Sequence, residues 1–188
     1  MHSLRFNPLP HWKGNGANWY FLGFNQMLLE LSNRFRDSSN LKMLEIGSYQ
    51  GESTFLFASL GIFDEIHCID PFAGYEEAND ILGNTWVDVK KEFQTNTRYF
   101  NNITLHQDFS YTIYNTFEDN YFDFIYIDGN HGYEDVKRDI ELYLPKCKHI
   151  IAGHDYTDNW PSVVSAVDST VGIPTEVYPD SSWIKVLG

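Results

Sequence analysis

The stretch Leu44-Glu45-Ile46-Gly47-Ser48-Tyr49-Gln50-Gly51-Glu52-Ser53-Thr54 decides the fold, because it changes character twice within a few residues. Its apolar start predicts a short strand, its two glycines predict a turn, and the residues from Glu52 onward predict a helix. Glycine permits a positive φ and lets a ligand approach the backbone, so the turn is a candidate binding site. An ordinary strand-to-helix turn uses the same residues, and both interpretations stay open at this point.

The same alternation of strand, turn and helix continues along the chain. We expect strands at 42–46, 65–69, 103–106, 122–127, 149–152, 176–178 and 183–187, and helices at 18–35, 52–60, 85–100, 111–117, 133–144 and 161–171. This order predicts an α/β fold: a doubly wound, mostly parallel, Rossmann-like sheet of seven strands with an antiparallel closing strand and helices on both faces. We expect one domain over 1–188, with an N-terminal aromatic segment and helix at 1–41 and the core at 42–188.

Composition narrows the classes of partner. The 188 residues contain 13 Lys and Arg against 26 Asp and Glu, a net charge of −13 with neutral histidines. So few basic residues make nucleic acid and anionic membranes poor partners. The two cysteines, Cys68 and Cys147, have no metal-ligand spacing, and we find no signal peptide or membrane-spanning apolar run. We therefore expect a soluble, cytoplasmic protein.

Acidic residues lie at or just after the ends of five successive expected strands, and in α/β sheets ligands bind beyond those strand ends. These residues are Glu45, Asp70, Asp108, Asp128 and Asp155. Asp70 lies 23 residues after Gly47, where a carboxylate can accept hydrogen bonds from ribose hydroxyls. Tyr49 stands where the dinucleotide motif G-x-G-x-x-G has its second glycine, so a ligand with a ribose but no pyrophosphate is favoured over NAD.

Five segments together resemble a known family: Glu45–Thr54, Ile69–Phe72, Gln107–Ser110, Phe124–Asp139 and Ala152–Tyr156. They are similar to class I S-adenosylmethionine-dependent methyltransferases. The most similar branch is the compact one that includes the magnesium-dependent macrolide-sugar O-methyltransferases and the cephalosporin-hydroxylase-like proteins. The resemblance covers about residues 42 to 170 and is more specific in its second half.

The resemblance implies a cofactor site. Glu45 and the turn Gly47–Gly51 would hold the methionine part, Asp70 the ribose, and Asp108 the adenine amino group, with the Phe109 backbone beside the ring. The implied set is Glu45, Gly47, Ser48, Tyr49, Gly51, Ser53, Thr54, Asp70, Pro71, Asp108, Phe109 and Asp128. Two alternatives stay open: Asp108 as the N-cap of a helix and Asp70 as a turn residue before Pro71.

The resemblance also implies a reactive centre. Asp128, His154 and Asp155 would bind Mg²⁺ or Mn²⁺, and His131 would take the proton of the substrate, so that Asp128 and His131 are the candidate catalytic residues. His154 stands where the macrolide enzymes have a carboxylate. If His154 binds the metal, its imidazole favours Mn²⁺ over Mg²⁺. The alternative is that His154 only makes a hydrogen bond. The alternative for Asp128 and His131 is a turn and cap before the helix at Tyr133.

The predicted function is S-adenosylmethionine-dependent methyl transfer to a hydroxyl of a small molecule, with a sugar as one candidate. Competing hypotheses are a catalytically inactive binding protein of the same fold, a nicotinamide-dependent oxidoreductase and a metal-dependent phosphoesterase. A phosphoesterase would need further metal-ligand motifs, which this sequence lacks. A homo-oligomer is left open. His67, His106 and His149 fall in expected strands and are interpreted as packed or solvated. We expect the N-terminal aromatic residues to pack on the sheet; the alternative is that they form a lid over the cofactor or a dimer contact. We expect the acidic segment 75–80 to be solvated surface; the alternative is a flap on the substrate side.

Overall fold

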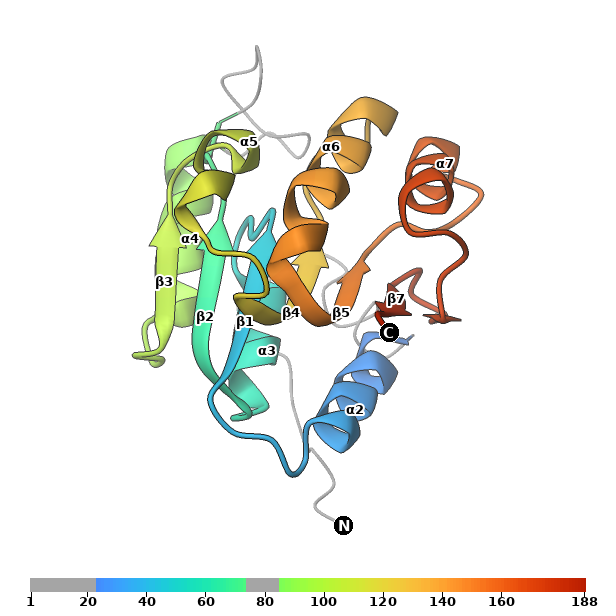
Figure 1. Ribbon diagram of the computed structural model, residues 1–188. Coiled ribbons are helices and arrows are strands. Elements are labelled where there is room, and N and C mark those ends of the chain that lie inside the picture. The colour runs from blue at the N-terminus through green and yellow to red at the C-terminus, as the bar shows by residue number, and fades with distance from the viewer. Residues whose placement is uncertain (1–22, 74–84) are drawn as a thin grey trace.

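The computed structural model describes residues 23–73 and 85–188. Seven strands form one sheet in the order β3-β2-β1-β4-β5-β7-β6 (Figure 1). The strands are β1 (Leu41–Ile46), β2 (Phe63–Ile69), β3 (Ile103–His106), β4 (Phe122–Ile127), β5 (Cys147–Gly153), β6 (Glu176–Val177) and β7 (Trp183–Val186). Strands β1 to β5 are parallel, and β7 is antiparallel to both of its neighbours. The predicted doubly wound sheet with an antiparallel closing strand is confirmed.

The helices form two layers, one on each face of the sheet (Figure 1). They are α2 (Asn25–Arg34), α3 (Glu52–Ser59), α4 (Trp86–Thr97), α5 (Ser110–Ile113), α6 (Tyr133–Tyr143) and α7 (Pro161–Thr170), with the 3₁₀ turns η2 (Tyr114–Thr116) and η3 (Leu144–Lys146). Helices α2, α3 and α4 pack on one face, and α6 and α7 on the other. Strand β4 is buried throughout and contributes Phe124 and Tyr126 to the first core and Ile125 and Ile127 to the second. Burial on both faces explains its nearly continuous apolar sequence.

The predicted boundaries need small corrections. Helix α4 ends at Thr97, three residues before the expected end, while β5 begins two residues early because Cys147 pairs with Phe122. The expected helix 111–117 is a short α-helix followed by the 3₁₀ turn η2. The predicted N-cap Asn18 and the segment 75–80 lie outside the described residues. Within those residues no helix is long and apolar enough to cross a membrane.

The hydrogen-bond ladder of the sheet continues one residue beyond several strands, and this positions the polar residues that follow. Gly47 N donates to Ile69 O at 2.9 Å, and Asp128 N donates to Ile46 O at 2.8 Å. Asp70 N and His154 N make the corresponding bonds to His106 O and Ile127 O, each at 3.2 Å. The backbones of the first residues after β1, β2, β4 and β5 are therefore fixed as firmly as the strands themselves.

Gly47 allows the turn after β1 to approach the end of β4. Its φ is +83°, and a Cβ built on it would lie 2.0 Å from the carbonyl oxygen of Asp128. Any side chain at this position would push the two strand ends apart. Glycine is thus required here both by backbone conformation and by space.

We expect Gly47→Ala to destabilise the protein much more than Gly61→Ala, in urea unfolding followed by circular dichroism. Gly61 also has a positive φ, +65°, but a Cβ there meets nothing within 4 Å. The control substitution should cost about 1 kcal/mol through its backbone conformation alone. The contact with Asp128 should add roughly 2 kcal/mol or more at Gly47. Equal losses for the two variants would contradict the close approach.

Candidate functional site

A cavity of about 270 Å³ opens at the carboxyl ends of β1, β2 and β4, between α5 and α6. Six of the twelve predicted cofactor residues lie in its wall: Gly47, Tyr49, Asp70, Pro71, Phe109 and Asp128. The structure thus brings together residues from the ends of three strands and from the start of α5. The cavity has the location expected for a ligand site in a doubly wound sheet.

Glu45, Ser53 and Thr54 do not reach this wall. Glu45 is fully buried, accepts a hydrogen bond from Ser53 Oγ at 2.5 Å and another from Thr54 Oγ1, and burial raises the pKa of its carboxyl group. The three side chains fasten the first turn of α3 to β1. The structure gives Glu45, Ser53 and Thr54 a supporting role beneath the turn, and their contact with the methionine part of a cofactor stays a prediction.

Ser48 and Gly51 also shape the turn rather than line the cavity. Ser48 is buried and its carbonyl oxygen accepts a bond from Gly51 N at 2.7 Å. Gly51 has a φ of +78° and begins α3. From the predicted stretch Gly47–Gly51, only Gly47 and Tyr49 lie in the wall.

Asp70 joins the end of β2 to the turn after β1. Its Oδ2 accepts a hydrogen bond from Tyr49 N and its Oδ1 one from Phe72 N, both at 2.7 Å. Burial raises the pKa of this carboxyl group, and the side chain is still part of the cavity wall. Asp70 is therefore both a turn residue and a cavity residue, which combines the two interpretations of the sequence.

Asp108 is used differently from the prediction. It is exposed, and its Oδ1 accepts bonds from Phe109 N at 2.8 Å and Thr112 Oγ1 at 2.6 Å. These contacts hold the start of α5, but the N-cap of that helix is Phe109 and not Asp108, so the N-cap alternative is wrong. Asp108 does not lie in the cavity wall. Only its neighbour Phe109 does.

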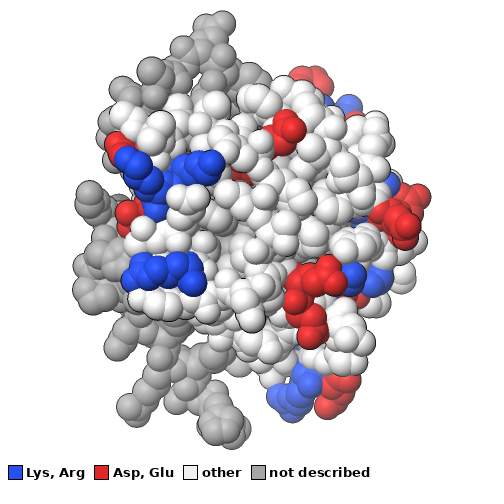
Figure 2. Space-filling model, turned by 90° about the vertical axis from the view of Figure 1, so that its left-hand side faces the viewer, with Lys and Arg blue, Asp and Glu red and all other residues white. Residues whose placement is uncertain are grey.

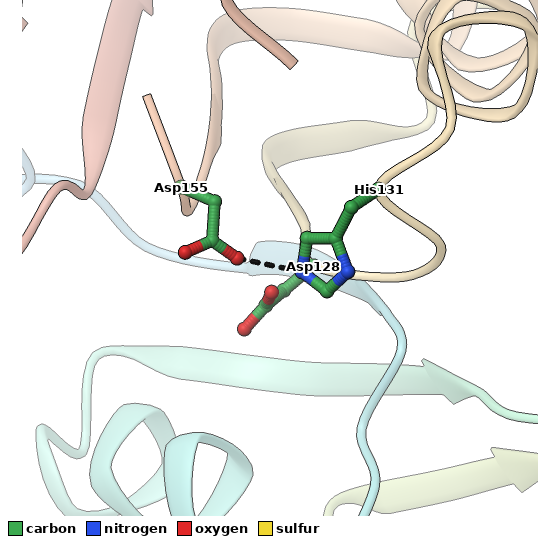
Figure 3. A group of neighbouring side chains, drawn as sticks. All are labelled: Asp128, His131 and Asp155. Carbon is green, nitrogen blue, oxygen red and sulfur yellow. Dashed lines mark ion pairs between the residues drawn. The ribbon is translucent and has the colours of Figure 1, made fainter. Parts of the chain in front are cut away.

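Asp128, His131 and Asp155 form a compact group beside the cavity (Figure 3). One nitrogen or oxygen ligand atom from each lies within 4.8 Å of the others, and His131 Nε2 is 2.6 Å from Asp155 Oδ2. The His131 ring stacks on Trp160 with ring centroids 4.4 Å apart. Asp128 belongs to both the group and the cavity wall, and it therefore links the two.

The turn before α6 does not use Asp128 or His131 as caps. Asn130 Oδ1 accepts the bond from Gly132 N at 2.9 Å, and Ser162 Oγ donates to the His131 carbonyl oxygen at 2.7 Å. The alternative interpretation of Asp128 and His131 as turn and cap residues is wrong. Their side chains face each other across the strand ends instead (Figure 3).

His154 lies next to this group but outside it. Its Nδ1 is 3.2 Å from Asp155 Oδ1, and its Nε2 is 3.9 Å from Oδ2 of the buried Asp180. The structure thus groups His131, rather than His154, with Asp128 and Asp155, and the ligand set of Asp128, His154 and Asp155 stays a prediction. Asp180 was not predicted, because it follows β6 and no motif spacing connects it to the other residues.

The charges in this group depend on one another. Hydrogen bonding to Asp155 raises the pKa of His131. Burial would lower the pKa of His154, but the carboxylates of Asp155, Asp128 and Asp180 raise it to about 9. Burial opposes ionisation of Asp155, yet its two histidine partners hold its pKa below the ordinary value, whereas burial raises the pKa of Asp128. At neutral pH, Asp155 is thus an ionised carboxylate beside a protonated His154.

The donor atoms fit a divalent cation. Within residues 23–73 and 85–188, this is the one cluster of three or more potential ligand residues. Carboxylate oxygens suit Mg²⁺ and Mn²⁺, and an imidazole ligand would favour Mn²⁺. His67 and His106, by contrast, pair with each other at 2.9 Å, and His149 is exposed, as their positions in strands led us to expect.

Helix α6 contributes a side of the cavity that the sequence did not indicate, through Asp135, Arg138 and Asp139. Arg138 binds Asp135 at 2.6 Å and lies over the Tyr111 ring. Asp139 is 5% exposed, accepts a bond from Ser110 Oγ at 2.5 Å, and has its pKa raised by burial to about 6. The sequence carried two signals for Asp139 but no role: it ends the segment Phe124–Asp139 of the family resemblance, and it lies on the apolar face of α6, between Val136 and Tyr143, where an acid is unusual.

Comparisons with known proteins identify the family of the chain. Residues 44–156 match a family model described as a methyltransferase domain, which is more than half of the 188 residues. The chain therefore belongs to this methyltransferase family. A search of curated proteins gives no match.

Solved structures show the same fold. A caffeoyl-CoA O-methyltransferase-like protein from Staphylococcus aureus aligns at 16% identity and a TM-score of 0.59, over 87% of this chain and 83% of the other. The O-methyltransferase TomG from Streptomyces achromogenes, in complex with S-adenosylmethionine, aligns at 12% identity and 0.59, over 88% and 80%. Spermidine synthase from Thermotoga maritima aligns at 15% identity and 0.57, over 94% and 60%. Family and fold together define a class I S-adenosylmethionine-dependent methyltransferase.

We expect Asp139→Asn to raise the midpoint of thermal unfolding at pH 7.5 but not at pH 4. The folded-state pKa of about 6 lies above the ordinary value of 3.8, so folding opposes ionisation of this carboxyl group. Above pH 6 the buried charge costs up to about 3 kcal/mol. As the pH falls through 6 the folded state takes up the proton, so that the cost is reduced to a small fraction near pH 4 and vanishes well below 3.8.

Asp119→Asn is the control, because Asp119 is an exposed acid whose ion pair with Lys146 is on the surface. It should change the unfolding midpoint little at either pH. An equal gain for Asp139→Asn at both pH values would show that burial of its charge is not the cause.

Proposed function

We propose that the protein transfers the methyl group of S-adenosylmethionine to a hydroxyl group of a small molecule, with His131 as the general base. The observation that carries this proposal is the 2.6 Å contact between His131 and Asp155, directly beside a cavity that shares Asp128 with the group. A histidine oriented by a carboxylate next to a cofactor site is the arrangement that general-base catalysis requires.

The contact with Asp155 defines which nitrogen of His131 can act. Because Asp155 is an ionised acceptor, Nε2 carries the proton that it binds, and Nδ1 keeps the lone pair that can accept a proton. Asp155 also stabilises the imidazolium that then forms, as in catalytic triads. Its effect on the pKa of His131 makes the imidazole a stronger base than in water.

The reaction forms one bond from the substrate oxygen to the methyl carbon and breaks the bond from that carbon to sulfur. The hydroxyl proton passes to His131, and the sulfonium becomes the neutral thioether of S-adenosylhomocysteine. Asp70 and Asp128 give the cavity wall two carboxylates, which suits a cofactor with a cationic sulfur and an ammonium group. A placed base contributes roughly 10² to 10⁴-fold to such a step.

The proposal includes a divalent cation, Mg²⁺ or Mn²⁺, for which the carboxylates of Asp128 and Asp155 are the ligands. Bound there, the ion would lower the pKa of a coordinated hydroxyl group. His131 cannot use Nε2 for an ion and for Asp155 at the same time, and we therefore assign His131 to proton transfer.

The acceptor is proposed from chemistry and from the relatives. Two of the structural neighbours are named as O-methyltransferases or similar to one. Trp160 is 41% exposed beside His131 and offers a flat surface on which a sugar or another ring can pack. Nucleic acid is a poor acceptor, because on the face in Figure 2 the described basic side chains form small groups separated by uncharged surface.

Calorimetry should show that the protein binds S-adenosylhomocysteine and not NAD, and that Asp70→Asn weakens this binding about tenfold or more. The substitution removes a carboxylate from the cavity wall. Asp64→Asn is the matched control: Asp64 also accepts a backbone hydrogen bond, from Leu41 N, but at the opposite end of β2. Binding of NAD without S-adenosylhomocysteine would refute the proposed function.

His131→Ala should lower turnover roughly 10² to 10⁴-fold with a sugar or phenol acceptor found by screening for released S-adenosylhomocysteine. Its affinity for S-adenosylhomocysteine should stay close to that of the unmodified protein, because His131 is not in the cavity wall. His149→Ala is the control, since His149 is exposed elsewhere. Full turnover of His131→Ala would exclude the base, and full turnover in EDTA would exclude the cation.

A further inference from the structure

The open space of the 270 Å³ cavity extends to Gly129, at the end of β4, and Ile46 and Asp139 also lie in its wall. A Cβ built on Gly129 would be in ordinary van der Waals contact with Asp139 Oδ2 at 3.7 Å and with Ile46 Cγ2 at 3.8 Å. These three residues are therefore close neighbours in the wall. A flat ring bound in the cavity can contact Gly129 and Ile46 with one edge directed toward a carboxylate oxygen.

The carboxylate of Asp139 is held in a fixed orientation. Ser110 Oγ donates to its Oδ1 at 2.5 Å, and the Ser110 carbonyl oxygen in turn accepts a bond from Tyr143 OH at 2.8 Å. Asp139 Oδ2, on the side of Gly129, has no hydrogen bond within the described part of the chain. An oriented acceptor thus faces the open space.

The other acids of the wall have other contacts or neighbours. Asp70 accepts two backbone hydrogen bonds, Asp135 binds Arg138, and Asp128 lies beside His131 and Asp155. The family resemblance would assign the adenine amino group to Asp108, but this residue contacts the start of α5 and lies outside the wall. Asp139 lies in the wall on the α6 side, away from the His131 group, with Oδ2 toward Gly129.

We propose that Asp139 is the residue that recognises the adenine of the cofactor, its Oδ2 accepting a hydrogen bond from the exocyclic amino group while the ring lies on Gly129 and Ile46. This inference rests on the proposed binding of S-adenosylmethionine. A carboxylate selects adenine because the amino group is a donor, whereas hypoxanthine presents a carbonyl oxygen at the same position. Two facing acceptors repel each other and leave a buried group unsatisfied.

Burial of the Asp139 carboxylate destabilises the folded protein, and this cost supports a role of the residue in ligand binding. Burial raises the pKa of Asp139 to about 6, so the fold must hold an unfavourable charge at neutral pH. The bond to Ser110 Oγ does not require a charge, because an asparagine could accept it as well. Strained or costly ionisable groups in a cavity are typical of functional sites.

The test compares S-adenosylhomocysteine with S-inosylhomocysteine, in which a carbonyl oxygen replaces the amino group, by isothermal titration calorimetry. The unmodified protein should prefer the adenine ligand roughly 10- to 100-fold. Asp139→Asn, which keeps the size of the side chain, and Asp139→Ala, which removes the acceptor, should each reduce this preference to about threefold or less. Asp108→Asn, the matched control at the other candidate acid, should retain it.

The outcomes separate the inference from the proposed function. Equal affinity of the unmodified protein for the two ligands would overturn the role of Asp139, as would a full preference in both Asp139 variants. Loss of the preference in Asp108→Asn alone would assign adenine recognition to Asp108. Failure of the unmodified protein to bind S-adenosylhomocysteine would instead refute the proposed function. Thermal unfolding of each variant confirms that it is folded at the temperature of the titration.

Discussion

The backbone contact between Gly47 and the carbonyl oxygen of Asp128 determines where the site lies. A Cβ on residue 47 would come within 2.0 Å of that oxygen, so the turn after β1 and the end of β4 meet through main chain alone. β1 and β4 are adjacent parallel strands at the centre of the sheet, and the helices that follow them, α3 and α6, pack on opposite faces. The chain therefore diverges at this contact, and a crevice opens there as in other doubly wound sheets. Its two sides are the cavity and the His131 group, with Asp128 shared between them.

Burial decides what the acids around this crevice can do. A buried carboxylate needs hydrogen-bond donors, and the nearest donors are usually its own backbone and helix starts. Glu45 is satisfied by two hydroxyl groups and no longer reaches a ligand, while Asp70 is satisfied by two backbone N–H groups and still forms part of the wall. Asp139 has one oxygen satisfied by Ser110. The number of donors that the fold supplies thus separates acids that support the site from acids that can bind in it.

The fold was predictable because its signal is local. The clearest case is β4, an apolar run followed by the polar Asp128, and its one charged residue, Asp123, is explained by bonds from Lys42 N at 2.8 Å and Lys148 Nζ at 3.1 Å. The site was predictable only to the level of strand ends, because the backbone ladder fixes where residues 70, 128 and 154 start but not where their side chains point. That is why the sequence did not indicate that the His131 side chain, and not that of His154, lies in the group with Asp128 and Asp155. The contribution of α6, above all Asp139, depends on how that helix packs over β4 and α5, which no spacing in the sequence expresses.

In the proposed function, the same electrostatics distinguishes binding from catalysis. The carboxylates of the wall would attract the sulfonium before the reaction, and this attraction at sulfur would be lost when methyl transfer leaves a neutral thioether. An interaction that is strongest in the ground state favours binding of the cofactor and release of its product, but it does not lower the barrier. The acceleration must therefore come from groups whose effect grows as the substrate oxygen loses its proton. As the proposed base, His131 would meet that condition, because Asp155, itself ionised between two histidines, would stabilise the imidazolium only once it forms. In this proposal the acids of the cavity and the acid behind His131 act at different stages of one reaction, although all of them lie at the same edge of the sheet.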